Sequence, residues 1–122
     1  MCIRDRFRLL RAARAFLDPM LNLGLITREE AGRILREEAL FSPGMVKQEL
    51  DRYTFRMPGQ AGSYYYGYRK LIDLRIETEI ALGEDFEEKA FNDFLLSQGI
   101  IPLELMAQAV REEFIPSQRS GQ

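Results

Sequence analysis

Proline, glycine and helix-capping residues divide this chain into about six segments, and each segment is rich in residues that favour a helix. Between these breakers no stretch alternates apolar and polar residues over a useful length, so strands are not expected. Hydrophobic residues make up 46% of the chain, enough to bury a core. We therefore predict an all-α fold of about six helices. The sequence offers no linker between two domains, so we expect residues 7–116 to be one helical portion of a single domain.

Two helix starts have specific signatures. Thr27 followed by Glu30 predicts a capping box, in which each side chain bonds the other residue's backbone N–H, and a helix should follow to about Leu40. Ser42 and Pro43 predict a second start, with serine as N-cap and proline at the first helical position. The helix that follows should end before Pro58.

Other breakers predict where the remaining helices end. Pro19 should end or kink the first helix, and the longest helix should run from about Gln60 to Leu82. Gly83 and Gly99 are placed to follow helix ends in a left-handed conformation. The remaining expectations are that Asp85 caps the helix before Gly99, that Pro102 opens the last helix, that Pro116 closes it, and that residues 117–122 form a frayed polar tail.

The amino-acid composition excludes several functions. The chain has no histidine and one cysteine, Cys2, so it holds no Ser-His or Cys-His catalytic pair, no disulfide and no zinc site of the usual ligands. Neither of the familiar glycine-rich phosphate-binding motifs occurs. The net charge of -2 gives no reason to expect nucleic acid as a partner, and no apolar run is long enough to span a membrane.

The first six residues, Met1 to Arg6, look foreign. They back-translate to a string that resembles the end of a transposase adapter used to prepare sequencing libraries. We therefore expect residues 1–6 to be an artefact and the natural coding sequence to begin upstream. A targeting segment would lie upstream as well, so the sequence leaves the location open between cytoplasm and export.

Tyrosines cluster at the start of the longest predicted helix. If that helix begins at Gln60, its free N–H groups form a local site for an anion or a carboxylate. The hydroxyls of Tyr64, Tyr65 or Tyr68 could donate to a developing oxyanion, although tyrosines on a long helix usually belong to the core. Arginines such as Arg52 and Arg75 are more often ion-pair partners than substrate clamps.

Several short motifs of the chain resemble the C-terminal part of the domain-of-unknown-function 885 (DUF885) family. The resemblance covers about Phe7 to Pro116, and the order and spacing of the pieces make it specific. The matching residues are Arg11-Ala-Ala-Arg14, Asp18, Glu49-x-x-Arg-Tyr53, Pro58-Gly-Gln-Ala61, Tyr64-x-x-Gly67, Leu74-Arg75, Leu82-Gly83, Phe86, Phe91-x-Asp93, Gly99 and Pro102-Leu103.

Members of this family are larger, mainly bacterial and mostly helical, and they look like zinc metallopeptidases of the gluzincin type. Their metal motif resembles His-Glu-x-x-Pro-Gly-His-His, with a later Glu-Gly-Trp-Ala segment, and neither is present here. The resemblance implies that Tyr64 supports the tetrahedral intermediate, with Tyr65 and Tyr68 as alternatives. It also implies weaker substrate-binding roles for the residues Gln60, Arg52 and Arg75. Asn22 and Asn92 stand where many members have histidine, which suggests a distinct subfamily.

These features lead to two main hypotheses. In the first, the chain is a C-terminal fragment of a zinc-dependent peptidase, inactive and metal-free alone, which forms a cleft wall in a parent that binds zinc and peptide substrates. Its partner would be the missing N-terminal part of the same protein. In the second, it is a non-enzymatic helical module that binds another protein through apolar faces. A carboxylate-based hydrolase within the chain is a third option, but no carboxylate pair stands out.

Overall fold

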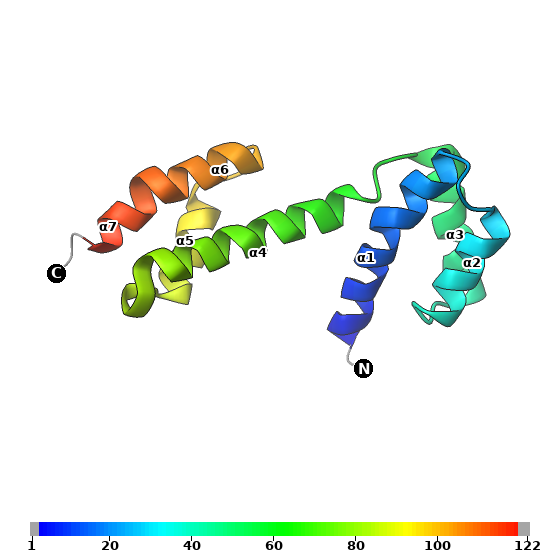
Figure 1. Ribbon diagram of the computed structural model, residues 1–122, viewed down its shortest axis with the longest axis horizontal. Coiled ribbons are helices and arrows are strands. Elements are labelled where there is room, and N and C mark those ends of the chain that lie inside the picture. The colour runs from blue at the N-terminus through cyan, green and yellow to red at the C-terminus, as the bar shows by residue number, and fades with distance from the viewer. Residues whose placement is uncertain (1–2, 120–122) are drawn as a thin grey trace. The chain divides into compact units, whose positions relative to one another are not determined.

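The computed structural model describes residues 3–119, and these residues form helices and connecting turns without a strand. The all-α prediction is therefore confirmed. If α6, the π-helical turn after it and α7 are counted as one continuous run, the number of helices is the expected six. The α-helices are α1 (Ile3–Asn22), α2 (Arg28–Glu37), α3 (Pro43–Asp51), α4 (Ser63–Leu82), α5 (Glu88–Ser97), α6 (Leu103–Ala109) and α7 (Ile115–Arg119) (Figure 1).

Three short helical turns complete the described chain. Arg52–Arg56 is a π-helical turn that continues α3, Gly83–Asp85 is a 3₁₀ turn after α4, and Val110–Phe114 is a π-helical turn between α6 and α7. Residues 1–2 of the expected foreign start and residues 120–122 of the expected tail lie outside the described range. The chain divides into two compact units, Met1–Tyr66 and Gly67–Gln122, with the boundary inside α4.

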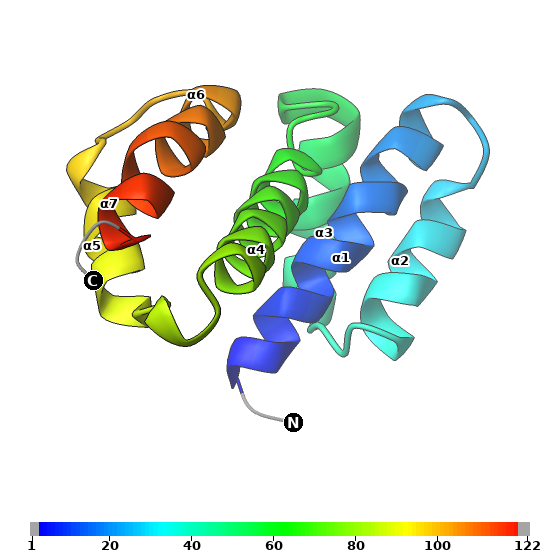
Figure 2. The ribbon, with the colours of Figure 1, turned by 60° about the vertical axis from the view of Figure 1, so that its left-hand side comes forward.

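The first unit is built from α1, α2, α3 and the π-helical turn Arg52–Arg56, and α1 lies beside α2 and α3 in both ribbon views (Figures 1 and 2). Apolar residues at helical spacing face the middle of this unit, because their burial removes apolar surface from water. Its buried hydrophobic core contains Leu10, Ala13, Leu17, Ala31, Leu35, Ala39, Phe41, Val46, Leu50, Tyr53 and Ala61.

The second unit has a core of aromatic and aliphatic side chains from α4 to the end of the described chain. The Phe91 and Phe114 rings meet edge to face at 5.8 Å between centroids, and Phe94 lies 5.2 Å from Phe114. Such ring pairs contribute about 0.5–1.5 kcal/mol beyond the burial of their area. The buried members of this core are Leu74, Leu82, Phe91, Met106, Val110 and Phe114.

The predicted capping signals are confirmed. The Thr27 hydroxyl accepts the N–H of Glu30 at 3.1 Å, and the Glu30 carboxylate accepts the N–H of Thr27 at 2.8 Å. Ser42 caps α3 with Pro43 at the first turn. Gly83 and Gly99 both have positive φ, 58° and 71°, as expected for glycines that follow a helix end.

A helix was predicted to end at Pro116 and to end or kink at Pro19, and neither proline ends its helix. Helix α1 passes Pro19 and ends at Asn22, where the Asn22 amide bonds the Asp18 backbone oxygen at 2.8 Å and the N–H of Leu23 bonds the oxygen of Pro19 at 2.9 Å. These bonds satisfy two of the carbonyl oxygens in the last turn of α1. Pro116 does not end the last helix either, since the helical run continues past it to Arg119.

Three further boundaries differ from prediction. Helix α2 ends at Glu37, three residues before Leu40. Asp85 does not cap α5, because it lies in a 3₁₀ turn closed by the Phe86 N–H on the Gly83 oxygen at 3.3 Å, and the N-cap is Glu87. Helix α4 begins at Ser63 rather than Gln60.

Candidate functional site

A buried carboxylate fixes the loop that precedes α4. Asp18, on α1, is 0% exposed, and its two oxygens accept the backbone N–H groups of Gly59 at 2.8 Å and Ala61 at 3.0 Å. The Asn22 amide donates to the same carboxylate at 2.9 Å and to the Tyr53 backbone oxygen at 3.2 Å. The sequence predicted an anion or carboxylate site at the free N–H groups of a helix beginning at Gln60, but α4 begins at Ser63, and the protein's own Asp18 bonds the N–H of Ala61 within that stretch. This is also why the loop does not extend α4 back to Gln60.

A second buried polar network joins α1 to α3. Arg14 donates through Nε to Glu49 at 2.6 Å and also through Nη2, and the hydroxyl of Tyr53 donates to the same carboxylate at 2.7 Å. Burial alone raises the pKa of Glu49, but the hydrogen bonds from Arg14 and Tyr53 outweigh it and hold that pKa below its usual value. Burial, followed by the hydrogen bond to Glu49, raises the pKa of Tyr53. Tyr53 is therefore a neutral, fully buried structural tyrosine.

Three of the residues singled out in the sequence come together beside these networks. Arg52 lies at the start of the π-helical turn, Gln60 lies in the loop held by Asp18, and Tyr64 lies in the first turn of α4. Nη2 of Arg52 donates to Oε1 of Gln60, and the Arg52 guanidinium lies 5.7 Å from the centre of the Tyr64 ring. π-Helical turns occur often at functional sites.

Tyr64 is the exposed member of this group, with 47% of its surface accessible. Hydrogen bonds from Arg52 and then Gln60, together with the positive charge of Arg52, lower the pKa of its hydroxyl below the usual value. Because a guanidinium carries only donors, Arg52 cannot accept the phenol proton of Tyr64, and that proton can be donated to a ligand. The arrangement can act chemically as a preorganised hydrogen-bond donor at the surface of the first unit.

The other candidates have different surroundings. Tyr65, in the first unit, and Tyr68, in the second, are both half-buried, and each has an interaction with another group. Arg75 lies in the second unit, where it donates to Glu79 and to Glu88, each at 2.8 Å. It also lies over the Phe86 ring at 5.9 Å. Arg75 therefore forms ion pairs, which is the more frequent role expected for such an arginine.

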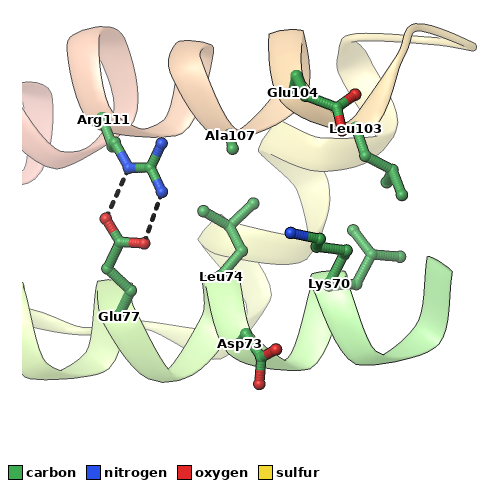
Figure 3. Close-up of a pocket in the computed structure, with 9 residues that line it drawn as sticks. Lys70, Asp73, Leu74, Glu77, Leu103, Glu104, Ala107 and Arg111 are labelled. Atoms are coloured by element: carbon green, nitrogen blue, oxygen red, sulfur yellow. Dashed lines mark hydrogen bonds and ion pairs between the residues drawn. The ribbon is translucent and has the colours of Figure 1, made fainter. Parts of the chain in front are cut away.

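A cavity of about 260 Å³ lies in the second unit between α4 and α6 (Figure 3). Leu74 and Leu103 face the space between the two helices, and Asp73 points away from α6. At one end Arg111 forms a two-pronged ion pair with Glu77, at 2.6 and 2.8 Å. Because these charges already neutralise each other, the cavity has no polar group waiting for a ligand at that end.

A zinc site needs three or four ligating side chains close together. Across residues 3–119, no three side chains of the His, Cys, Asp or Glu type come together in a way that could hold a metal ion. Asp18 and Glu49, the two most enclosed carboxylates of the site, are held by N–H groups, an arginine and a tyrosine. The donor set on these residues therefore does not fit zinc.

No helix among the described residues has both the length and the apolar character to cross a membrane. Neither the curated proteins nor the solved structures contain a match to this chain. A family model does match, over residues 3–110, and its description is "Bacterial protein of unknown function (DUF885)". The match includes both buried networks and the Arg52, Gln60 and Tyr64 group. The chain therefore belongs to the DUF885 family of bacterial proteins.

Proposed function

We propose that this chain forms one wall of the cleft of a larger zinc-dependent peptidase, and that Tyr64 donates a hydrogen bond to the oxyanion formed when a peptide carbonyl is attacked. The observation that carries the proposal is an exposed tyrosine, Tyr64, whose ring centre lies 5.7 Å from the Arg52 guanidinium and whose pKa Arg52 and Gln60 lower. The peptidase assignment itself rests on the resemblance described above.

The chemistry follows from the direction of the hydrogen bonds. Arg52 carries only donors, so a contact with the Tyr64 oxygen uses a lone pair of that oxygen and leaves the phenol proton for the substrate. A lower pKa makes the phenol a stronger donor to developing negative charge. Loss of one such donor in an acyl-transfer enzyme lowers kcat by about 10²–10³-fold.

The surrounding networks supply the rigidity that such a donor needs. Asp18 holds the residues on either side of Gln60, and Gln60 in turn contacts Arg52. Arg14 and Tyr53 hold Glu49 on the helix that leads into Arg52. Catalytic groups must be held within about 0.5 Å of their productive position, and buried polar networks are one way to hold them.

The metal of this proposal is bound by sequence outside the chain, because the described residues do not provide its ligands. The chain's own contribution to the reaction is therefore the hydrogen bond from Tyr64. The proposal expects the 122-residue chain to be inactive and metal-free when produced alone.

The experiment uses the full-length protein encoded by the upstream reading frame. The proposal predicts a His-Glu metal helix in that frame, about one bound zinc per chain, and hydrolysis of peptides that is lost when a chelator removes the metal. An upstream frame without such a helix, or a full-length protein that binds no zinc, would contradict the peptidase assignment.

A second function, a helical protein-interaction module, is favoured by exposed apolar side chains. Phe55 in the first unit is 78% exposed, and Ile80, Leu96 and Ile100 in the second are 79%, 79% and 107% exposed. The wall of a larger domain would also expose such residues, so they do not separate the two functions. The module is supported if the full-length protein forms a defined complex, binds no zinc and hydrolyses no peptide.

A further inference from the structure

We infer that Arg52 binds the free C-terminal carboxylate of the peptide substrate, with Tyr64 beside it as the donor to the carbonyl that is cleaved. This inference rests on the proposed function, since it names the substrate class of the same site. It assigns the intact protein to peptidases that cut close to a free C-terminus.

Arg52 differs in its ion pairing from the other half-buried arginines of the described residues, Arg14, Arg28 and Arg75. It is half-buried, yet none of the salt bridges between residues 3–119 includes it. Arg14 is paired with Glu49, and Arg75 with Glu79 and Glu88. Removing a charge from water is costly unless an opposite charge or several hydrogen bonds compensate it. An anionic ligand provides that compensation for Arg52.

The hydrogen-bonding capacity of Arg52 is only partly used. Its guanidinium has five N–H donors, and its partners on the protein are the neutral side chains of Gln60 and Tyr64. Its Nε is buried without a hydrogen-bond partner in the described part of the chain. The charge of Arg52 also acts on Glu49 and helps to lower its pKa, but that carboxylate is bonded by Arg14 and Tyr53. Arg52 therefore has no ion-pair partner among the described residues and can bind an anionic ligand.

The nearest acidic groups have other partners. Glu49 accepts bonds from Arg14 and Tyr53, and Asp18 accepts the N–H groups of the loop before α4. Asp18 also makes those N–H groups unavailable to an external anion. Arg52 and Tyr64 are the side-chain donors that remain for a ligand beside this loop.

The chemistry of these donors favours a carboxylate at the end of a peptide. A guanidinium matches the planar geometry of a carboxylate and can bind it through two parallel hydrogen bonds. The Arg52 guanidinium lies 5.7 Å from the centre of the Tyr64 ring. An extended peptide advances about 3.3–3.6 Å per residue, so a carboxylate at Arg52 places a carbonyl one or two residues away near Tyr64. Cleavage there releases one or two residues from the C-terminus.

The first test measures binding to the 122-residue chain, without catalysis. The probes are acetyl-alanyl-alanine, with a free carboxylate, and its C-terminal amide, each followed by NMR titration of backbone amides. We expect the acid to bind with a Kd on the order of 1 mM and the amide at least about tenfold more weakly. Equal binding of the two probes, or no binding of the acid, overturns the inference.

Variants locate the binding site. Arg52→Gln should weaken binding of the acid at least about tenfold. Arg52→Lys should weaken it less, because lysine keeps the positive charge but lacks the two parallel N–H donors of the guanidinium. Arg69→Gln is the matched control, since Arg69 is exposed and paired with Asp73 in the second unit. Circular dichroism checks that each variant is helical. If Arg52→Gln fails to fold, Arg52→Lys and the amide probe still decide the question. Unchanged binding in Arg52→Lys and Arg52→Gln overturns the inference.

The second test separates this inference from the proposed function. The full-length protein is given the same peptides as free acids and as C-terminal amides, and we expect kcat/KM to be at least about 100-fold higher for the acids. Equal hydrolysis of both overturns the carboxylate inference and leaves the peptidase proposal standing. Binding of the acid through Arg52 without any hydrolysis contradicts the peptidase proposal and leaves an anion site.

Discussion

The Asp18 carboxylate accepts the backbone N–H of Gly59 at 2.8 Å across 41 positions of the sequence. The same side chain accepts the N–H of Ala61, so both of its oxygens bind the loop that carries Gln60. One buried carboxylate therefore sets the position of the loop, and through Gln60 it sets the position of Arg52.

The first prediction concerns this carboxylate. Asp18→Asn keeps the size of the side chain but replaces one acceptor with an amide that faces an N–H donor. We expect the free energy of unfolding of the first unit to fall by about 1–3 kcal/mol. Urea unfolding should show the loss, and hydrogen exchange should show faster exchange at Gly59 and Ala61. Asp93→Asn is the control, because Asp93 forms an exposed ion pair with Lys89 worth about 0–1 kcal/mol.

The second prediction concerns pH. The pKa of Glu49 is held below its usual 4.5 in the folded state, so its contribution to stability is fully present above that value. The contribution is lost as the pH falls through the lower, folded pKa. Glu49→Gln should lower the free energy of unfolding at pH 7 by about 1–3 kcal/mol and reduce its acid dependence.

A matched control for Glu49 is Glu77, whose pKa is also lowered, by Arg111, but whose side chain is 45% exposed. Glu77→Gln should change stability by only about 0–1 kcal/mol. Unfolding measured at several pH values from neutral to acid compares the two variants. The same acid dependence in Glu49→Gln as in the parent chain would contradict the assigned network.

The third prediction concerns Tyr64. Hydrogen bonds from Arg52 and Gln60 lower its pKa below 10.0, so this hydroxyl should ionise at lower pH than an ordinary tyrosine. Arg52→Gln removes the first of these bonds and the positive charge, and the pKa of Tyr64 should rise toward the usual value. Ultraviolet titration measures the change, and the signal is assigned by its absence in Tyr64→Phe. An unchanged titration in Arg52→Gln would mean that Arg52 does not act on this hydroxyl.

The fourth prediction concerns the backbone after α2. Leu40 has φ 58°, in the left-handed region that favours glycine, and its side chain is 55% exposed. Leu40→Gly should stabilise the chain by about 1 kcal/mol, because the strain of a side chain in this conformation costs about 1–2 kcal/mol. Leu40→Ala keeps a side chain at the same φ and should bring no such gain. Thermal unfolding of the two variants tests whether the strain is present.

Local signals in the sequence predicted the local parts of the fold. The capping box at Thr27 and Glu30, the Ser42 cap and the glycines at 83 and 99 depend on residues within a few positions of one another, and each is confirmed. The helices pass Pro19 and Pro116 without ending, because a proline removes one backbone hydrogen bond and the remaining bonds of the helix can still hold its conformation.

The site was only partly accessible to sequence reasoning. Arg52, Gln60 and Tyr64 were singled out, but their contact depends on the π-helical turn and on the loop held by Asp18. Asp18 stood among the residues that resemble the family, but nothing near it in the sequence indicated which groups it binds. Hydrogen bonds across 41 and 43 positions are tertiary, and no local pattern encodes them.

The role that we propose for Tyr64 is that of hydrogen-bond donor to the oxyanion in a larger peptidase. It is tested most directly by kcat for peptide hydrolysis by the zinc-loaded full-length protein carrying Tyr64→Phe. Tyr66→Phe, an exposed tyrosine two positions away, is the matched control. We expect kcat to fall by about 10²–10³-fold in Tyr64→Phe and to change little in Tyr66→Phe. Undiminished kcat in Tyr64→Phe would contradict it, and would transfer the role to Tyr65 or Tyr68 or remove it from this segment.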